Sequence, residues 1–218
     1  MVEESQLEDL LQPHGLVVLG ILQEPPERQT VLVGNAGSSI WQAFAGSTEN
    51  RDGLPHPMDR WSKRIGTAIA SELQADVIFP FEGPPYPPVL NWTEQAGQAF
   101  PSPISMFIHR KYGLWHAYRF ALLLKAPFSG SAVATQNTSP CLSCKTQPCL
   151  SACPVNAFTG EKYRVGDCVD YLASDAESAC RKQGCSARKA CPIAVSYQYE
   201  PPHAHFHMNA FLAAQKIV

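Results

Sequence analysis

All eight cysteines of this 218-residue chain lie between Cys141 and Cys191. The first four have the spacing Cys-x2-Cys-x4-Cys-x3-Cys-Pro, and the last of the other four is again followed by proline. Four thiolates bind one 4Fe-4S cluster, and in two-cluster proteins the cysteine before the proline binds the other cluster. The chain therefore has ligands for two 4Fe-4S clusters with none left over: Cys141, Cys144, Cys149, Cys153, Cys168, Cys180, Cys185 and Cys191.

Disulfide bonds and zinc are the alternatives to this interpretation. Disulfides suit small secreted chains, but residues 1–5 are acidic where a signal peptide is basic, and no apolar run is long enough to cross a bilayer. We therefore expect a cytoplasmic protein with reduced thiols and no membrane partner. Zinc ribbons usually pair two Cys-x2-Cys knuckles, of which the chain has one, so zinc stays an alternative. Unligated buried cysteines are disfavoured because Ser, Lys, Gln, Pro and Gly surround these thiols.

The charge balance gives no sign of a nucleic-acid partner, because 17 Lys and Arg face 19 Asp and Glu. The charge is nevertheless uneven: residues 1–140 hold 9 basic and 13 acidic side chains, and residues 141–218 hold 8 and 6. Basic side chains near the cysteines would offset the negative charge of thiolate-bound clusters, although ordinary surface charge explains each of them equally well. They are Lys145, Arg164, Arg181, Lys182, Arg188 and Lys189.

Hydrophobic periodicity predicts a layered α/β or α+β domain over residues 1–136, with a mixed sheet and packed helices. We expect helices at residues 3–12, 57–73 and 92–100, paired strands at 16–22 and 30–33 joined by a turn at Pro25 and Pro26, a strand at 76–79 and an irregular loop at 81–89. Residues 104–108 and 115–125 are predicted to form a hairpin with Gly113 at its tip. A Ser-, Thr-, Pro- and Gly-rich linker at 126–139 then leads to a second domain, residues 137–218.

Residues 34–39 form a glycine-rich segment between an expected strand and an expected helix. Exposed backbone amides in such a loop can bind an anion, which makes Gly34, Gly37 and Ser38 candidate binding residues. The segment has neither the three-glycine dinucleotide fingerprint nor the lysine of a P-loop. A tight turn with a serine N-cap is the alternative, and we favour it.

Three histidines alternate near the end of the chain, at His203, His205 and His207. In a strand their imidazoles would share one face and suit a metal, but in a helix they would not converge. The apolar residues that follow have helical spacing, so we expect a helix or loop here rather than a further metal site.

The cysteine segment resembles the double-cluster domain of bacterial ferredoxins, and more closely the cluster half of epoxyqueuosine reductases and reductive dehalogenases. The resemblance rests on residues 149–158, CLSACPVNAF, and on the CVDYL that begins at Cys168. The gaps from Cys144 to Cys149 and from Cys185 to Cys191 depart from the pattern. The resemblance implies a small ferredoxin-like domain with crossed ligation, in which Cys141, Cys144, Cys149 and Cys191 hold one cluster and Cys153, Cys168, Cys180 and Cys185 hold the other.

A second resemblance concerns residues 104–119, ISMFIHRKYGLWHAYR, which are similar to a strand-turn-strand segment of the animal cobalamin-processing protein. That family has a nitroreductase-like α+β core, on which epoxyqueuosine reductases and dehalogenases also build a corrinoid site. The resemblance implies a corrinoid site in the first domain, with His56, Arg60, His109 and Arg119 as candidate pocket residues. Alternatively, His56 only begins a helix, and Arg119 pairs with an acidic side chain across the sheet.

Two functions follow from these observations. The first is an electron-transfer protein whose clusters serve a redox partner protein or a small-molecule acceptor, and we favour it because the cysteine pattern carries most of the information. The second is a corrinoid- or flavin-dependent reductase, an oxidoreductase related to epoxyqueuosine reductase or reductive dehalogenase, whose clusters relay electrons to the first domain. Tyr112, Tyr118 and His116 are available as its proton donors, and the sequence does not select among them.

Overall fold

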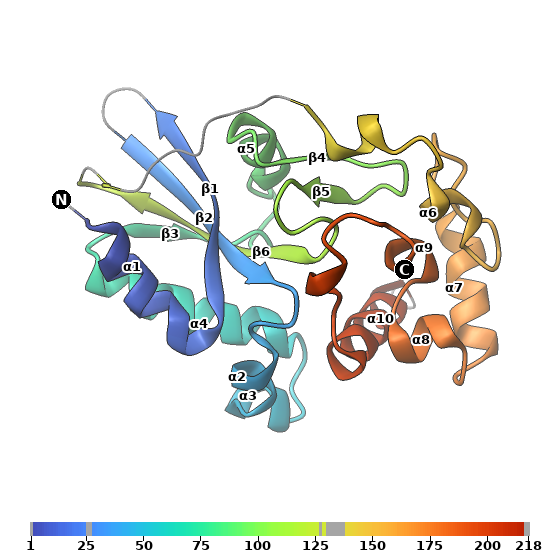
Figure 1. Ribbon diagram of the computed structural model, residues 1–218. Helices are drawn as coiled ribbons and strands as arrows, with labels where there is room; N and C mark the ends of the chain where they lie inside the picture. The colour runs from blue at the N-terminus through green and yellow to red at the C-terminus, as the bar shows by residue number, and fades with distance from the viewer. Residues whose placement is uncertain (1, 25–27, 127, 130–137, 216–218) are drawn as a thin grey trace. The chain divides into compact units, whose positions relative to one another are not determined.

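The structure is a computed structural model that describes residues 2–24, 28–126, 128–129 and 138–215. The chain folds into two compact units (Figure 1): unit 1 is Met1–Gln98 with His116–Asn137, and unit 2 is Ala99–Trp115 with Thr138–Val218. The predicted boundary at residue 136 places Ala99–Trp115 in the first domain. In the structure this segment instead packs with the cysteine-containing part of the chain. The reason is apolar burial, because Ile104, Ile108 and Leu114 share a hydrophobic cluster with Cys153 and Cys191.

Unit 1 contains a four-stranded sheet in the order β1-β2-β6-β3. Its strands are β1 (Leu16–Glu24), β2 (Arg28–Ala36), β6 (His116–Leu124) and β3 (Asp76–Ile78), and every pairing between them is antiparallel. The α+β class is confirmed, but the expected mixed sheet is wrong. The predicted pairing of residues 16–22 with 30–33 is also confirmed. The turn predicted at Pro25 and Pro26 lies among residues that the structure does not describe, as does most of the predicted linker.

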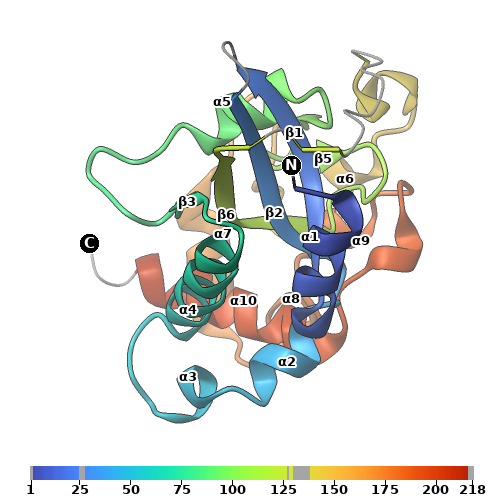
Figure 2. The same ribbon diagram turned by 90° about the vertical axis from the view of Figure 1, so that its left-hand side faces the viewer.

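Helices cover both faces of this sheet. The helices of unit 1 are α1 (Glu4–Leu11), η1 (Gln12–His14), α2 (Trp41–Ala45), α3 (Thr48–Arg51), α4 (Pro57–Glu72) and α5 (Val89–Gln95). Figures 1 and 2 show α1 and α4 on one face and α5 on the other. The helix predicted at 92–100 is shorter than expected, since α5 ends at Gln95 and a strand follows it.

Helix α4 packs closely on β6 because Gly66 has no side chain. A Cβ atom at Gly66 would lie 2.9 Å from ring carbons of Phe120 and Phe79. Trp61, only 1% exposed, lies one turn and a half before Gly66 on the buried side of α4. The next strand residue, Ala121, points to the other face and belongs to a hydrophobic cluster that includes Ala96 and Trp92. Unit 1 is thus held together by apolar layers on both sides of its sheet.

Unit 2 contains a small hairpin of β4 (Ala99–Pro101) and β5 (Phe107–His109). The hairpin predicted between residues 104–108 and 115–125 is wrong, since β6 pairs with β2 and β3. Hydrogen bonds from His109 N to Gly113 O (2.7 Å) and back (2.8 Å) close a separate turn before β6 begins. Gly113 has a φ of +58°, and a Cβ atom there would lie 2.5 Å from the carbonyl oxygen of Ile193.

The remainder of unit 2 is a series of mostly short helices joined by turns, followed by the longer helix α10. They are η2 (Pro140–Ser143), α6 (Pro148–Ser151), α7 (Val165–Ser174), α8 (Ala179–Gln183), α9 (Ser186–Lys189), η3 (Val195–Tyr197) and α10 (Pro201–Gln215). No helix in the described part of the chain is both long and apolar enough to cross a membrane.

Candidate functional site

Four cysteines of unit 2 form a first group, which we call set A: Cys141, Cys144, Cys149 and Cys191. Burial raises the pKa of Cys141, Cys149 and Cys191, and neighbouring thiolates of set A raise it further. Cys149 interacts with all three other members, and Cys191 also interacts with Cys144. Thiols 50 residues apart in the sequence therefore lie within electrostatic reach of each other.

The other four cysteines form a second group, set B: Cys153, Cys168, Cys180 and Cys185. All four line one hollow, together with Pro154, Val155, Phe158, Tyr171, Ser186, Ala187 and Met208. Burial raises the pKa of Cys168, as do the thiolates of Cys153 and Cys180. Burial also raises the pKa of Cys185 to about 11, with further contributions from Cys180 and Cys168.

Local chain geometry explains how neighbouring cysteines reach different sets. Gln147 has a φ of 39° and is followed by Pro148, so the chain turns sharply before α6 and places Cys149 on that short helix. Helix α6 ends at Ser151, and Asn156, with a φ of 50°, helps to turn the chain again beyond Cys153. Because the helix stops between them, Cys149 lies among the thiols of set A, whereas Cys153 lines the hollow of set B.

Sets A and B contain the same cysteines as the two ligand groups implied by the resemblance to epoxyqueuosine reductases. All eight cysteines are free thiols, so no disulfide connects them. In the described residues, no three His, Cys, Asp or Glu side chains converge tightly enough to hold a single metal ion.

Several basic side chains of unit 2 fix the loops around the cysteines. Arg164 forms an ion pair with Asp167 at 3.1 Å and donates a hydrogen bond to the carbonyl oxygen of Asn156. Arg181 donates hydrogen bonds to Leu172 O and Asn209 Oδ1. These contacts give Arg164 and Arg181 a structural role beside any effect of their charge on the cysteine sets.

Arg188 connects the segment Ala99–Trp115 to the cysteine-containing segment. Its guanidinium lies 4.6 Å from the ring centre of Trp115 and 4.3 Å from that of Tyr199. Its Nε donates a hydrogen bond to the carbonyl oxygen of Leu114 at 3.0 Å. A cation between two aromatic faces holds this junction within unit 2.

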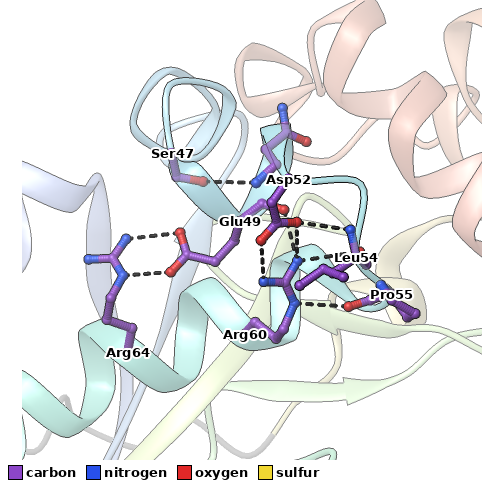
Figure 3. Close-up of polar contacts among 8 residues, drawn as sticks. Ser47, Glu49, Asp52, Leu54, Pro55, Arg60 and Arg64 are labelled. Atoms are coloured by element: carbon purple, nitrogen blue, oxygen red, sulfur yellow. Dashed lines mark hydrogen bonds and ion pairs between the residues drawn. The ribbon is translucent and has the colours of Figure 1, made fainter.

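In unit 1 the candidate residue Arg60, on α4, is hydrogen-bonded to the loop that precedes this helix (Figure 3). Its guanidinium donates two hydrogen bonds of 2.7 Å to the carboxylate of Asp52 and another of 2.9 Å to the carbonyl oxygen of Pro55. Next to it, Arg64 donates to the carboxylate of Glu49 at 2.6 Å and holds the pKa of Glu49 at about 2. These contacts anchor the turn between α3 and α4.

Two other candidates of unit 1, His56 and Arg119, both lie near Asp59. His56 is exposed, and its Nδ1 lies 3.9 Å from the carboxylate of Asp59. Arg119 is buried and donates hydrogen bonds of 2.9 and 3.1 Å to the side-chain oxygen of Asn35. Burial raises the pKa of Asp59, while the charges of Arg119 and His56 oppose that rise. Sequence reasoning missed Asp59, although its position three residues after His56 on a helix was the available signal.

His109 lies in unit 2, whereas His56, Arg60 and Arg119 belong to unit 1. It is buried, its Nδ1 accepts hydrogen bonds from the backbone amides of Lys111 and Tyr112, and its ring lies 4.7 Å from that of Tyr112. His109 therefore orders the turn that ends at Gly113.

The glycine-rich segment forms a tight turn, as we favoured, but the serine N-cap is wrong, because the N-cap of α2 is Ile40 and no side chain caps that helix. Gly34 is part of β2, where a Cβ atom would lie 2.0 Å from the carbonyl oxygen of Ala117. Gly37 has a φ of +57°, and its carbonyl oxygen accepts a hydrogen bond from the Asn35 side chain at 2.9 Å. Ser38 lies in the turn, and the hydroxyl of Ser39 donates to the carbonyl oxygen of Gly15.

Among the suggested proton donors, Tyr118 is partly buried with its hydroxyl near Thr93, and burial raises its pKa to about 12. The His116 ring lies 5.4 Å from that of Tyr118 in unit 1, while Tyr112 packs against Tyr197 in unit 2. No contact in the described residues selects one of these three side chains as a proton donor.

The three alternating histidines lie on α10, in agreement with the helix or loop expected there. The Nε2 atoms of His203 and His207 lie 3.0 Å apart, and both rings pack against Tyr199. His205 points elsewhere, with its Nδ1 2.9 Å from the carbonyl oxygen of Arg181. The three imidazoles therefore do not converge on one point.

Comparison of this chain with protein-family models, with curated proteins and with solved structures found no match. Its function is therefore argued from its own side chains.

Proposed function

We propose that this chain is an iron-sulfur electron-transfer protein that holds one 4Fe-4S cluster on set A and another on set B. The observation that carries the proposal is the sorting of eight thiols into two groups of four within unit 2. Unit 2 would then be a ferredoxin-like double-cluster domain, and its partner a redox protein or a small-molecule acceptor. Free thiols and redox-active clusters are typical of a reducing compartment, from which we infer a cytoplasmic location.

The arrangement of the thiols suits clusters. A 4Fe-4S cluster takes one thiolate at each of its four irons, so its ligands spread around a cube instead of meeting at one ion. Set B surrounds a hollow from four separate segments: the turn after α6, α7, α8 and the start of α9. When bound, the clusters supply single-electron transfer, and the chain's own contribution is to hold the thiolates, limit access of water and provide hydrogen bonds to sulfur.

The direct test is to purify the chain without oxygen and measure its iron, sulfide and zinc. The proposal predicts a brown protein with broad absorption at about 400 nm and about four irons for each set of four cysteines. A colourless protein that holds zinc and no sulfide would overturn it.

A second candidate function is a corrinoid- or flavin-dependent reductase built on a nitroreductase-like unit 1. The observation in its favour is the grouping of His56 and Arg119 around Asp59, because a half-buried carboxyl with a raised pKa is typical of functional sites. In this reading the clusters of unit 2 are the source of electrons for unit 1.

The absorption spectrum separates the two functions. A reductase of this kind shows sharp corrin or flavin bands and, for a corrinoid, cobalt in the metal analysis. If both are absent after growth with added cobalamin and riboflavin, while the clusters are present, electron transfer alone remains. Asp59→Asn is expected to lower cofactor retention and leave the iron content unchanged.

A further inference from the structure

One side-chain hydroxyl of unit 2 is hydrogen-bonded to a cysteine sulfur at the hollow of set B. Ser186 Oγ lies 3.1 Å from Cys180 Sγ, and both residues line the hollow. Cys180 is only 6% exposed, so little water competes for its sulfur. Because a ligand thiolate carries no proton, the hydroxyl must be the donor whenever Cys180 is bound to iron.

The hydroxyl of Ser186 is not needed for its helix. Helix α9 spans Ser186–Lys189, its N-cap is Cys185, and no side chain caps its first turn. The backbone carbonyl of Ser186 accepts the amide of Ala190, and that bond survives loss of the hydroxyl. In the described residues, the hydroxyl of Ser186 is therefore hydrogen-bonded to the sulfur of Cys180.

Other donors face the same set. The backbone amide of Ala157 donates to Cys153 Sγ at 3.3 Å. The hydroxyl of Tyr163 is close to Cys168, since burial and a hydrogen bond to that thiol both raise the pKa of Tyr163. Backbone amides of Arg188 and Ala187 also hydrogen-bond Cys185 and oppose the rise in its pKa. Donors thus face all four sulfur atoms of set B, and Ser186 is the serine among them.

We propose that Ser186 is a positioning residue that raises the reduction potential of the set B cluster by donating a hydrogen bond from its Oγ to Cys180 Sγ. The inference rests on the proposed function and deepens it, because it assigns a tuning residue to one of the two clusters. A cluster held by set B would accept one electron from its redox partner, and the hydrogen bond from Ser186 to Cys180 Sγ would stabilise the added negative charge while the proton stays on Ser186. A cluster without this bond is harder to reduce.

The experiment is a spectroscopic redox titration of wild type and Ser186→Ala, each with its iron and sulfide counted first. Removing one hydrogen bond is expected to disfavour reduction of the set B cluster by about three- to tenfold, where tenfold is about 59 mV for one electron. One potential moves to a more negative value, and the other stays. Ser186→Thr keeps a hydroxyl and is expected to restore the shifted potential.

Ser151→Ala is the matched control. Ser151 lies two residues from Cys149 and from Cys153, but its hydroxyl donates to the carbonyl oxygen of Pro148 at 3.2 Å. Its loss is expected to leave both potentials unchanged. If Ser186→Ala carries both clusters with unshifted potentials, or if Ser151→Ala produces the same shift, the assignment of Ser186 is wrong while the proposed function stands.

A measurement on the wild-type protein covers the case in which Ser186→Ala does not assemble its clusters. Electron-nuclear double resonance of the reduced protein in D2O is expected to detect a hydroxyl deuteron coupled to the set B cluster, which Ser186→Thr retains. Absence of that deuteron in a protein with both clusters overturns the inference. Absence of iron and sulfide from the wild type overturns the proposed function itself.

Discussion

The two units of this chain are stabilised in different ways. Unit 1 buries apolar layers on a regular sheet, and its charged candidates are held by neighbours, as Arg60 is by Asp52. Unit 2 has mostly short helices, and its hydrophobic groups of buried side chains include Cys153, Cys180 and Cys191. Short helices are unstable alone, so a domain arranged around thiols depends on what those thiols bind. We therefore expect unit 1 to be complete as a protein fold, and unit 2 to need the proposed clusters for its stability.

The largest difference between the two units is expected when the proposed clusters are removed from unit 2. Treatment with a chelator under oxidising conditions should unfold α7, α8 and α9, because thiolate ligation stabilises so small a domain. Hydrogen exchange followed by mass spectrometry should show rapid exchange over residues 165–189 and unchanged protection in β1, β2 and β6. Equal loss of protection in both units would contradict the difference drawn between them.

Phe120→Ala tests whether unit 2 keeps its iron when unit 1 is destabilised. Phe120 is 1% exposed and packs on Gly66 and Phe79, so truncation of its ring is expected to cost about 3–5 kcal/mol in the free energy of unfolding of unit 1. Denaturant unfolding measures that loss. The iron content per folded chain should stay at the wild-type value, and loss of the clusters together with unit 1 would show that the units do not fold independently.

A smaller effect is expected at the ion pair of Glu49 and Arg64 in unit 1. The pKa of Glu49 falls from 4.5 to about 2, chiefly because of its hydrogen bond from Arg64. A lowered pKa in the folded state stabilises the fold above about pH 4.5, and this contribution is lost as the pH falls towards 2. Glu49→Gln is therefore expected to cost about 1–2 kcal/mol at pH 7, after allowance for the exposure of Arg64, and little at pH 2. Unfolding measured at several pH values would contradict this prediction if Glu49→Gln cost the same free energy of unfolding at every pH.

The smallest effect is expected from Tyr163→Phe in unit 2. This change keeps the ring stacked on Phe158 at 4.6 Å and removes only the hydroxyl near Cys168. One reduction potential should become more negative by a shift no larger than that of Ser186→Ala. Tyr171→Phe is the control, because Tyr171 lines the same hollow but its hydroxyl is hydrogen-bonded with Ser178. Equal shifts in the two variants would assign the effect to the loss of any hydroxyl.

The sequence predicted the regular elements of unit 1 well, because their periodicity is strong. The amphipathic pattern of residues 57–73 corresponds to α4, and the apolar run from residue 16 corresponds to β1. The hairpin was wrong because a turn at His109–Gly113 resembles a hairpin tip in sequence, although it closes on itself. The three-residue strand β4 carries no periodicity, so only tertiary pairing with β5 defines it.

The candidate site was predictable to a different extent in each unit. Cysteine spacing and resemblance predicted two groups of thiols, and local turns such as that at Gln147 bring the same thiols near each other. That these groups bind clusters stays a prediction. The pocket candidates of unit 1 depended on long-range packing that sequence does not reveal. His109 belongs to unit 2, and Asp59 was overlooked because its burial and its interaction with the distant residue Arg119 arise only in the folded chain.

The most direct test of the central claim compares two cysteines that are four residues apart but belong to different sets. Cys149→Ser and Cys153→Ser, prepared without oxygen, are each predicted to retain about four irons. Electron paramagnetic resonance of the reduced variants should then show two different single clusters, without the spin coupling of the wild type. Loss of the same cluster in both variants, or a wild type with no iron, would contradict the assignment of Cys149 to set A and Cys153 to set B.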